Sequence, residues 1–256
     1  MTKYNIGKAH QKKIREEQSI IDNGGLFGYP IADIKNCQLK EVDYQTAKKI
    51  IEQYEWLGTM GTTQKHYGIY FEGVCGGVIG FGYFQAMNTN SGGHPYAPYV
   101  SEKFAFKGIQ LTRGACTWWA HKHSGSKLIG YGLRQMQKKG YKYVVAFSDA
   151  EAGEIGTLYQ ATNWHYLGFG KTKHYDIYYS NGKIYMNDRD FYKKYKYSGK
   201  NKMQKFIEDK PQFCIKERLP KARYIKLIGN KYENKEMLKT LKPLILPYPK
   251  RKNINI

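Results

Sequence analysis

The sequence has few cysteines, few acidic residues and no long apolar run. The cysteines Cys37, Cys75, Cys116 and Cys214 form no C-x-x-C pair. This scatter argues against a zinc ribbon or a disulfide framework and predicts reduced, buried thiols. No stretch approaches the roughly 20 apolar residues of a bilayer helix, and residues 1–17 lack the apolar core of a signal peptide. We therefore expect a soluble, intracellular protein with no membrane partner.

Acidic residues are outnumbered two to one by basic ones. The chain has 21 Asp and Glu against 42 Lys and Arg, which gives a formal net charge of +21. Residues 187–256 alone contribute 13 of these net positive charges, and tyrosines are interleaved with them. Such an excess predicts a polyanionic partner, and basic groups mixed with aromatic rings are typical of nucleic-acid contact. A solvated basic tail is the alternative interpretation.

Apolar spacing predicts a mixed α/β fold with a central sheet flanked by helices. Apolar residues recur at helical intervals in two segments, and β-branched and aromatic residues concentrate in runs of strand length. Glu72-Gly73 separates two such runs and predicts a hairpin, and Gly140 follows a lysine-rich helix end. We predict helices over residues 42–54, 124–139, 157–163 and 234–241, and strands over 66–71, 74–84, 108–117, 141–147, 164–169, 174–179, 183–186 and 223–228.

Composition also suggests how the chain is divided. We expect a loosely ordered lead-in over residues 1–36 and a catalytic domain over residues 37–186. Residues 187–256 are expected to form a basic extension that contacts DNA. A chain of this length can hold one sizeable core together with such an appendage.

A small polar turn at residues 124–126 separates a strand from a helix. Unpaired backbone N–H groups at such a turn can hold a pyrophosphate, although Ser and Gly also cap ordinary helices. The order strand, turn, helix, buried strand, short helix resembles motifs A and B of the acetyl-CoA-dependent N-acetyltransferase superfamily. This resemblance implies a GNAT-like fold and acetyl-CoA or a related acyl-CoA as cofactor, with Tyr159 placed to protonate the departing thiolate. It implies a cofactor turn made of His121, Lys122, His123, Ser124, Gly125 and Ser126.

A second resemblance accounts for the same region. Arg113, Ser126, Asp149 and Tyr159, with the phrases Thr-Arg-Gly-Ala, Phe-Ser-Asp and Gly-Thr-Leu-Tyr-Gln-Ala-Thr-Asn-Trp, resemble the functional core of the phage Mom family. The resemblance implies transfer of a carbamoylmethyl group to the N6 amine of adenine in double-stranded DNA, which protects phage DNA from host restriction. It implies action in the cytoplasm of the infected host cell and allows a bound iron held partly by tyrosines.

Each of the four residues has a catalytic and a structural interpretation. Arg113 can clamp a phosphate or carboxylate, or form a structural ion pair. Asp149, at a carboxyl strand end, can orient the adenine amine or bind a metal, or cap the next turn. Tyr159 is interpreted as a general acid. Ser126 can donate to a phosphate or cap its helix.

Three further residues are predicted to bind substrate. Trp56 can stack on an adenine flipped out of the duplex, or pack in the core. Trp119 belongs to a tryptophan pair that alternates between strand faces, so one member is expected to face the site. Arg223 lies in the basic end of the chain, where the family resemblance continues. None of the histidines forms an H-E-x-x-H or His-Cys arrangement, so the sequence predicts no metal ligands directly.

Two alternatives to adenine modification stay open at this point. An N-acetyltransferase of the same fold could act on another amine, in a modified base, an RNA or a protein. A nonenzymatic DNA-binding protein on an inactivated fold is the other. Replacement of Asp149 or Tyr159 distinguishes an enzyme from a nonenzymatic DNA-binding protein. If these residues are catalytic, their replacement abolishes modification and leaves DNA binding intact.

Overall fold

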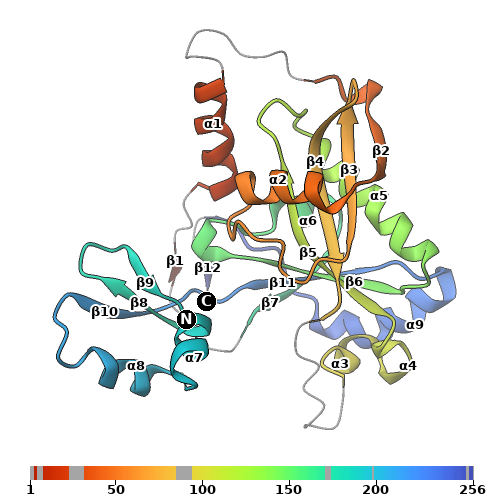
Figure 1. Cartoon of the computed structure of the whole chain (residues 1–256). Coiled ribbons are helices and arrows are strands. Elements are labelled where there is room, and N and C mark those ends of the chain that lie inside the picture. Colours follow the sequence, from red (N-terminus) through yellow and green to blue (C-terminus); the bar gives the residue numbers. More distant parts are fainter. Residues whose placement is uncertain are drawn as a thin grey trace.

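A mixed seven-stranded sheet forms the centre of the protein (Figure 1). The computed structural model describes residues 3–4, 8–22, 32–84, 94–170, 174–197, 199–251 and 254–255. All neighbouring strands of the sheet are antiparallel except β5 and β6, which run parallel. The strands, in spatial order, are β2 (Gln38–Glu41), β3 (Lys65–Phe71), β4 (Val74–Gly82), β5 (Gly108–Cys116), β6 (Tyr143–Ser148), β11 (Ala222–Leu227) and β7 (His165–Phe169).

Helices cover both faces of this sheet. Helix α2 (Tyr44–Tyr54) buries its apolar side against Val78 and Ala115. Helix α5 (Ser124–Lys138) packs against Ile79 and Phe81 on the opposite face. Because successive side chains of a strand point to opposite faces, neighbouring residues of β4 serve the two helices. The expected mixed α/β fold, with a central sheet flanked by helices, is confirmed.

Three further helices cover one face of the sheet around β6. Tyr143 and Val145 of β6 pack with three helices, whereas Val144 and Ala146 belong to the core beneath α5. The three helices are α3 (Ala97–Val100), α4 (Glu102–Ala105) and α9 (Lys231–Leu241). The nearly continuous apolar run of residues 141–147 suits this burial of β6 on both faces. Short 3-10 turns lie at Ile34–Asn36, Ala150–Ala152 and Lys242–Leu244.

The parallel strands β5 and β6 separate after a short paired stretch. Their register runs from Gly108 opposite Tyr143 to Leu111 opposite Ala146. Beyond these positions β5 continues to Cys116 beside β4, and β6 continues to Ser148 beside β11. The sheet therefore opens between the carboxyl ends of β5 and β6. Helix α5 and the short helix α6 (Thr157–Ala161) lie beside this opening.

A small α/β unit is inserted between β7 and β11. It contains the antiparallel strands β8 (Tyr175–Tyr179), β9 (Ile184–Met186) and β10 (Phe213–Glu217), and the helices α7 (Asp188–Tyr195) and α8 (Lys200–Ile207). Ile177, Phe191 and Met203 form its separate core. After this unit the chain returns to the central sheet as β11. The predicted basic extension over residues 187–256 is therefore wrong as a structural unit, because it joins half of the insertion to a strand of the main sheet.

The predicted lead-in contains a helix, α1 (His10–Asp22), none of whose residues is buried. Arg15 donates from Nη2 to the carbonyl oxygens of Trp118 and Ala120, at 3.3 and 3.1 Å. Polar contacts therefore attach α1 to the chain beyond β5. The two chain ends also pair with each other, as strands β1 (Lys3–Tyr4) and β12 (Ile254–Asn255). Among the helices that the structure describes, none has the length and apolar character that a membrane crossing requires.

Candidate active site

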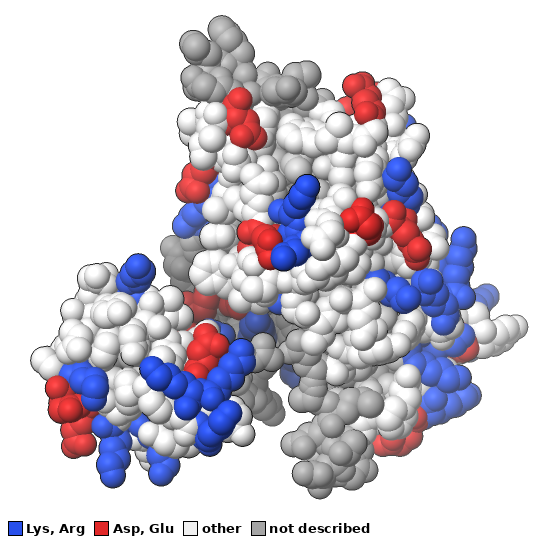
Figure 2. Space-filling model, in the orientation of Figure 1, with Lys and Arg blue, Asp and Glu red and all other residues white. Residues whose placement is uncertain are grey.

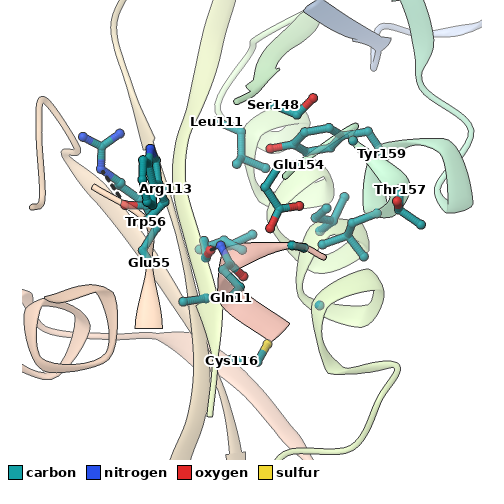
Figure 3. A pocket seen from close by; sticks show the side chains of 18 of the residues that line it. Gln11, Glu55, Trp56, Leu111, Arg113, Cys116, Ser148, Glu154, Thr157 and Tyr159 are labelled. Carbon is teal, nitrogen blue, oxygen red and sulfur yellow. Dashed lines mark hydrogen bonds and ion pairs between the residues drawn. The ribbon is translucent and has the colours of Figure 1, made fainter. Parts of the chain in front are cut away.

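A cavity of about 1060 Å³ occupies the opening between β5 and β6. Residues 110–116 of β5 and 147–149 at the end of β6 line it, together with the start of α5, helix α6, α1 and the segment after α2. Figure 3 shows Glu55, Trp56 and Arg113 on one side of the cavity and Glu154, Thr157 and Tyr159 on the other. Side chains from both faces of the sheet reach the cavity because no strand closes the gap.

All four residues predicted to be catalytic line this cavity. Arg113 lies on β5, Ser126 in the first turn of α5, Asp149 just after β6, and Tyr159 on α6. They come from separate elements, so the fold brings together residues that are up to 46 positions apart in the chain. Their lining positions are structural facts, and their chemical roles stay predictions.

Arg113 is held in place by the segment that follows α2. Its Nε donates to the carbonyl oxygen of Thr59 at 2.5 Å, and its Nη1 donates to the carbonyl oxygen of Thr112 at 2.7 Å. The Glu55 carboxylate lies 3.8 Å from the Arg113 Nε. A side chain at Gly61 would come within 2.7 Å of Nη2, so this glycine leaves room for the guanidinium. The arginine is therefore fixed at the cavity wall with its charge only partly balanced.

Asp149 is tied to its neighbours. Its Oδ1 accepts from the backbone N–H of Glu151 at 3.2 Å and so caps the 3-10 turn Ala150–Ala152. Its Oδ2 lies 3.2 Å from the Lys221 Nζ. Both features fit the structural interpretation, a capping carboxylate in an ion pair, at a position on the cavity wall. The Asp149 carboxylate is therefore held in a fixed position at the cavity wall.

Tyr159 is the half-buried phenol of the site. Its ring packs against Trp164 and Tyr224, with centroid distances of 5.1 and 5.3 Å. Burial raises the pKa of Tyr159 strongly, and the carboxylates of Glu154 and Glu55 raise it further. Within the part of the chain that the structure describes, its hydroxyl has no hydrogen-bond partner. The group is therefore protonated at neutral pH and able to donate into the cavity.

The first turn of α5 presents free backbone donors. The N–H of Ser124 donates to the His121 carbonyl at 2.8 Å, and the N–H of His123 donates to His121 Nδ1 at 3.1 Å. No acceptor among the described residues takes the N–H groups of Gly125 or Ser126. Ser126 also donates its hydroxyl to the His123 carbonyl at 2.9 Å, so this hydroxyl closes the turn. Free amides at a helix start suit an anion.

Most of the predicted cofactor turn faces the cavity. His121, Lys122, His123, Gly125 and Ser126 line it. Ser124 does not line it: its side chain is fully buried and its hydroxyl has no partner among the described residues. Helical geometry explains this difference, because adjacent residues of a helix project in different directions.

The three predicted substrate-binding residues have different positions. Trp56 lines the cavity, is 41% exposed and meets His10 edge-to-face at 4.8 Å. Trp119 was predicted to face the site and does not: it packs against Phe71, at 6.0 Å between ring centroids. Arg223 was also placed wrongly, because it donates to the Tyr99 hydroxyl at 2.9 Å and is absent from the cavity wall.

Strand alternation explains the position of Arg223. Its neighbour on β11, Tyr224, packs with Tyr159 and belongs to the core beneath α5. Adjacent strand residues point to opposite faces, so Arg223 lies on the face covered by α3 and α9. Its guanidinium also donates to the Leu167 carbonyl at 3.1 Å. The role of Arg223 is therefore to join elements of that face.

Glu154 is the site residue that the sequence analysis missed. It lines the cavity between Asp149 and Tyr159, and burial raises its pKa to about 6. The nearby carboxylates of Glu55 and Asp149 raise this pKa as well, whereas Arg251 opposes the effect. The pKa of Glu55 is likewise raised by burial, and Arg113 opposes that shift. The surrounding sequence has no signal for these shifts, because they arise mainly from burial in the folded protein.

The described residues do not provide a metal site. No group of three or more His, Cys, Asp or Glu side chains among them is placed to hold an ion. The four cysteines are free thiols, but all of them are half-buried rather than buried as predicted. The iron allowed by the family resemblance therefore has no fitting ligand set in this part of the chain, and we derive no step through it.

Comparison with known proteins agrees with the geometry of the site. Within the described residues, the mixed sheet opens at its parallel pair over a cavity lined by ionisable side chains and by a helix start with free backbone donors, an arrangement typical of an enzyme active site. The model of the Mom protein family matches residues 36–250, and the chain belongs to this family. It is similar to methylcarbamoylase mom of Escherichia phage Mu, at 23% identity over 180 residues, which cover 67% of this chain and 69% of that protein.

Solved structures of acetyltransferases overlap with the chain more loosely. The N-acetyltransferase from Staphylococcus aureus Mu50 has a TM-score of 0.42 at 13% identity and covers 75% of this chain and 99% of its own. The ribosomal-protein-S18-alanine N-acetyltransferase from Escherichia coli has a TM-score of 0.41 at 9% identity, with coverages of 75% and 94%.

Proposed function

We propose that the protein transfers a small, carbamoylmethyl-type group to the N6 amine of adenine in double-stranded phage DNA, in the cytoplasm of the infected host cell. The observation that carries this proposal is the cavity between β5 and β6, where Arg113, Ser126, Asp149 and Tyr159 of this Mom family member meet. The name of the phage Mu relative, a methylcarbamoylase, supports the class of group transferred. The modification would protect the DNA from restriction enzymes of the host.

The start of α5 is the proposed cofactor site. The free N–H groups of Gly125 and Ser126 point to an anionic group, and Lys122 adds positive charge beside them. These residues fit the pyrophosphate of acetyl-CoA or a related acyl-CoA. A thioester carbonyl would give an N-acyl product, so transfer of a carbamoylmethyl group requires a donor with its leaving group on the methylene carbon. In this proposal His121 and His123 shape the turn, since His121 accepts from the His123 backbone.

Residues on the walls of the cavity are proposed to protonate the leaving group, to bind negative charge and to position the substrate amine. Tyr159 donates its proton to the leaving group, because burial keeps the phenol protonated at neutral pH. Arg113 holds negative charge on the donor or on the DNA, since its charge is only partly balanced by Glu55. Asp149, fixed by Lys221, positions the amine of the substrate.

DNA is the proposed partner of the positively charged surface. Figure 2 shows several Lys and Arg, together with some acidic residues, on the small unit that contains α7 and α8. Lys193, Lys194, Lys196, Lys200, Lys202 and Lys205 are exposed there, next to the exposed rings of Tyr192 and Tyr197. Lysines contact phosphates without regard to sequence and make affinity dependent on salt. Trp56, exposed at the cavity, is placed to stack on an adenine that has left the duplex.

Nucleoside mass analysis of plasmid DNA from expressing cells tests the proposal. We expect a deoxyadenosine adduct of carbamoylmethyl mass with the wild type, and a large loss of this adduct with Tyr159→Phe, which removes only the phenol hydroxyl. Both proteins should bind DNA equally. An N-acetyl adduct would favour the acetyltransferase alternative, and unmodified DNA from cells with abundant protein would overturn the proposal.

A further inference from the structure

Three carboxylates line the cavity within the described residues, and they differ in their partners. Asp149 is engaged by the Glu151 N–H and by Lys221. Glu55 accepts from the Leu57 N–H at 2.8 Å and faces Arg113. The Glu154 backbone N–H donates to the Asp149 carbonyl at 2.9 Å, but its carboxylate forms no hydrogen bond and no ion pair with any of the described residues. It is therefore the carboxylate of the three that is available to a substrate.

The backbone that carries Glu154 is fixed on both sides. Gly153 and Gly156 both have positive φ, 69° and 73°. A side chain at Gly153 would meet the Lys8 carbonyl oxygen at 2.6 Å. The carbonyl of Ile155, between Glu154 and Gly156, accepts from the Tyr224 hydroxyl at 2.5 Å. These contacts leave the short segment little freedom, and Figure 3 shows the Glu154 side chain extending into the cavity.

The charged groups around Glu154 favour proton uptake at mildly acidic pH. Glu55, from the segment after α2, and Asp149, from the end of β6, both disfavour its ionised form. Arg251, near the chain end, favours the ionised form but donates from Nη1 to the Gly153 carbonyl at 2.7 Å. Lys8 directs its ammonium to Glu16. The carboxylate is thus ionised at neutral pH and more basic than an ordinary glutamate.

We propose that Glu154 is the general base of the transfer, and that its free carboxylate accepts the proton lost by the substrate amine. This proposal rests on the proposed function. As the amine nitrogen forms its bond to the electrophilic carbon of the donor, the bond from that carbon to the leaving group breaks. The leaving group keeps the bonding electron pair and receives the proton of Tyr159. The proton on the nitrogen passes to Glu154, so that charge and atoms balance.

The test compares purified wild-type protein with Glu154→Gln and with Glu151→Gln, a matched change on the same segment outside the cavity wall. Plasmid DNA is incubated with each protein and a deproteinised host extract as donor source, with acetyl-CoA in a parallel arm. The rate of adduct formation is followed by nucleoside mass analysis between about pH 5 and about pH 8. DNA affinity and thermal unfolding of each variant show whether it is folded.

The wild-type rate should rise with pH through about 6 and then level off. Glu154→Gln should lose about a hundredfold or more in rate, and the rise with it, because a general base contributes about 10²–10⁴-fold. Glu154→Asp, which keeps a carboxylate, should retain the rise at a lower rate. A Glu154→Gln protein with wild-type rate and pH dependence would overturn the role of Glu154 alone. Absence of any adduct with the wild type would overturn the proposed function as well.

Discussion

Replacing Glu154 by Gln should stabilise the protein at neutral pH and leave it unchanged in acid. The pKa of this carboxyl is raised from 4.5 to about 6 in the folded state. Below pH 4.5 it is protonated in both states and contributes no difference. As pH rises from 4.5 to 6 the unfolded chain loses its proton first, so the free energy of unfolding falls. Above about pH 6 the free energy of unfolding stays lower by the full amount.

The size of this effect follows from the shift. One pKa unit corresponds to about 1.4 kcal/mol, so the ionised Glu154 costs about 2 kcal/mol of stability at pH 8. Glu154→Gln, which carries no charge, should raise the free energy of unfolding by about that amount. For a chain of this size, Tm should rise by roughly 4–8 °C. Glu151→Gln serves as the control in both conditions.

Thermal unfolding followed by circular dichroism at pH 8 and pH 4 measures the difference. A variant that is no more stable than wild type at pH 8, or that gains equally at pH 4, would show that Glu154 is not a buried carboxyl with a raised pKa. This measurement does not depend on catalysis. It therefore tests the electrostatics of the cavity separately from the proposed reaction.

Three further changes probe other parts of the structure. Gly156→Ala should cost about 2–4 kcal/mol of stability, because φ is 73° and an added Cβ would lie 2.3 Å from the Tyr224 ring; wild-type stability in urea unfolding would contradict this close approach. Asp176→Asn should destabilise the small unit by about 3–5 kcal/mol, because Asp176 is buried and accepts two hydrogen bonds from Arg218 at 2.9 and 2.7 Å. Limited proteolysis of this variant should cut first within residues 175–217. An unchanged cleavage pattern would refute the role of this ion pair. Asn230→Ala should cost about 1 kcal/mol, because it removes the capping box at the start of α9; a smaller change than that of the exposed control Asn201→Ala in thermal unfolding would argue against it.

Local periodicity was sufficient to predict the centre of the fold. The helix expected over residues 42–54 is α2, and the helix expected over residues 124–139 is α5, which ends before Gly140. The hairpin at Glu72-Gly73 is confirmed, with positive φ at both residues. Each of these elements packs one face against the buried core. Its apolar residues therefore recur at regular intervals, which can be recognised in the sequence.

The insertion and helix α1 depend on contacts that leave no such pattern. Helix α1 has no buried residue and is attached by polar groups such as Gln11, which donates to the Gly114 carbonyl at 2.8 Å. Strand β11 lies between β6 and β7, and this position is set by pairing with strands far away in the chain. Because residues 187–256 are highly charged, the sequence did not indicate that part of them belongs to the small unit or that the chain then returns to the central sheet as β11.

The candidate site was predictable only in part, for a similar reason. Family resemblance indicated Arg113 and Tyr159, which both line the cavity. Glu154 escaped notice because its raised pKa depends on burial and on distant groups. Trp119 and Arg223 do not line the cavity, because the alternation of side chains along a strand does not tell which of the two faces is turned toward the site.

A short DNA duplex with a single adenine gives the most direct test of the central claim. The duplex is incubated with purified protein and deproteinised host extract, and the intact mass of each strand is compared before and after. We predict that the strand with adenine gains the mass of one carbamoylmethyl group, and that the same duplex with N6,N6-dimethyladenine gains nothing. A gain on both duplexes, or on neither with folded, DNA-bound protein, would contradict transfer to the N6 amine of adenine.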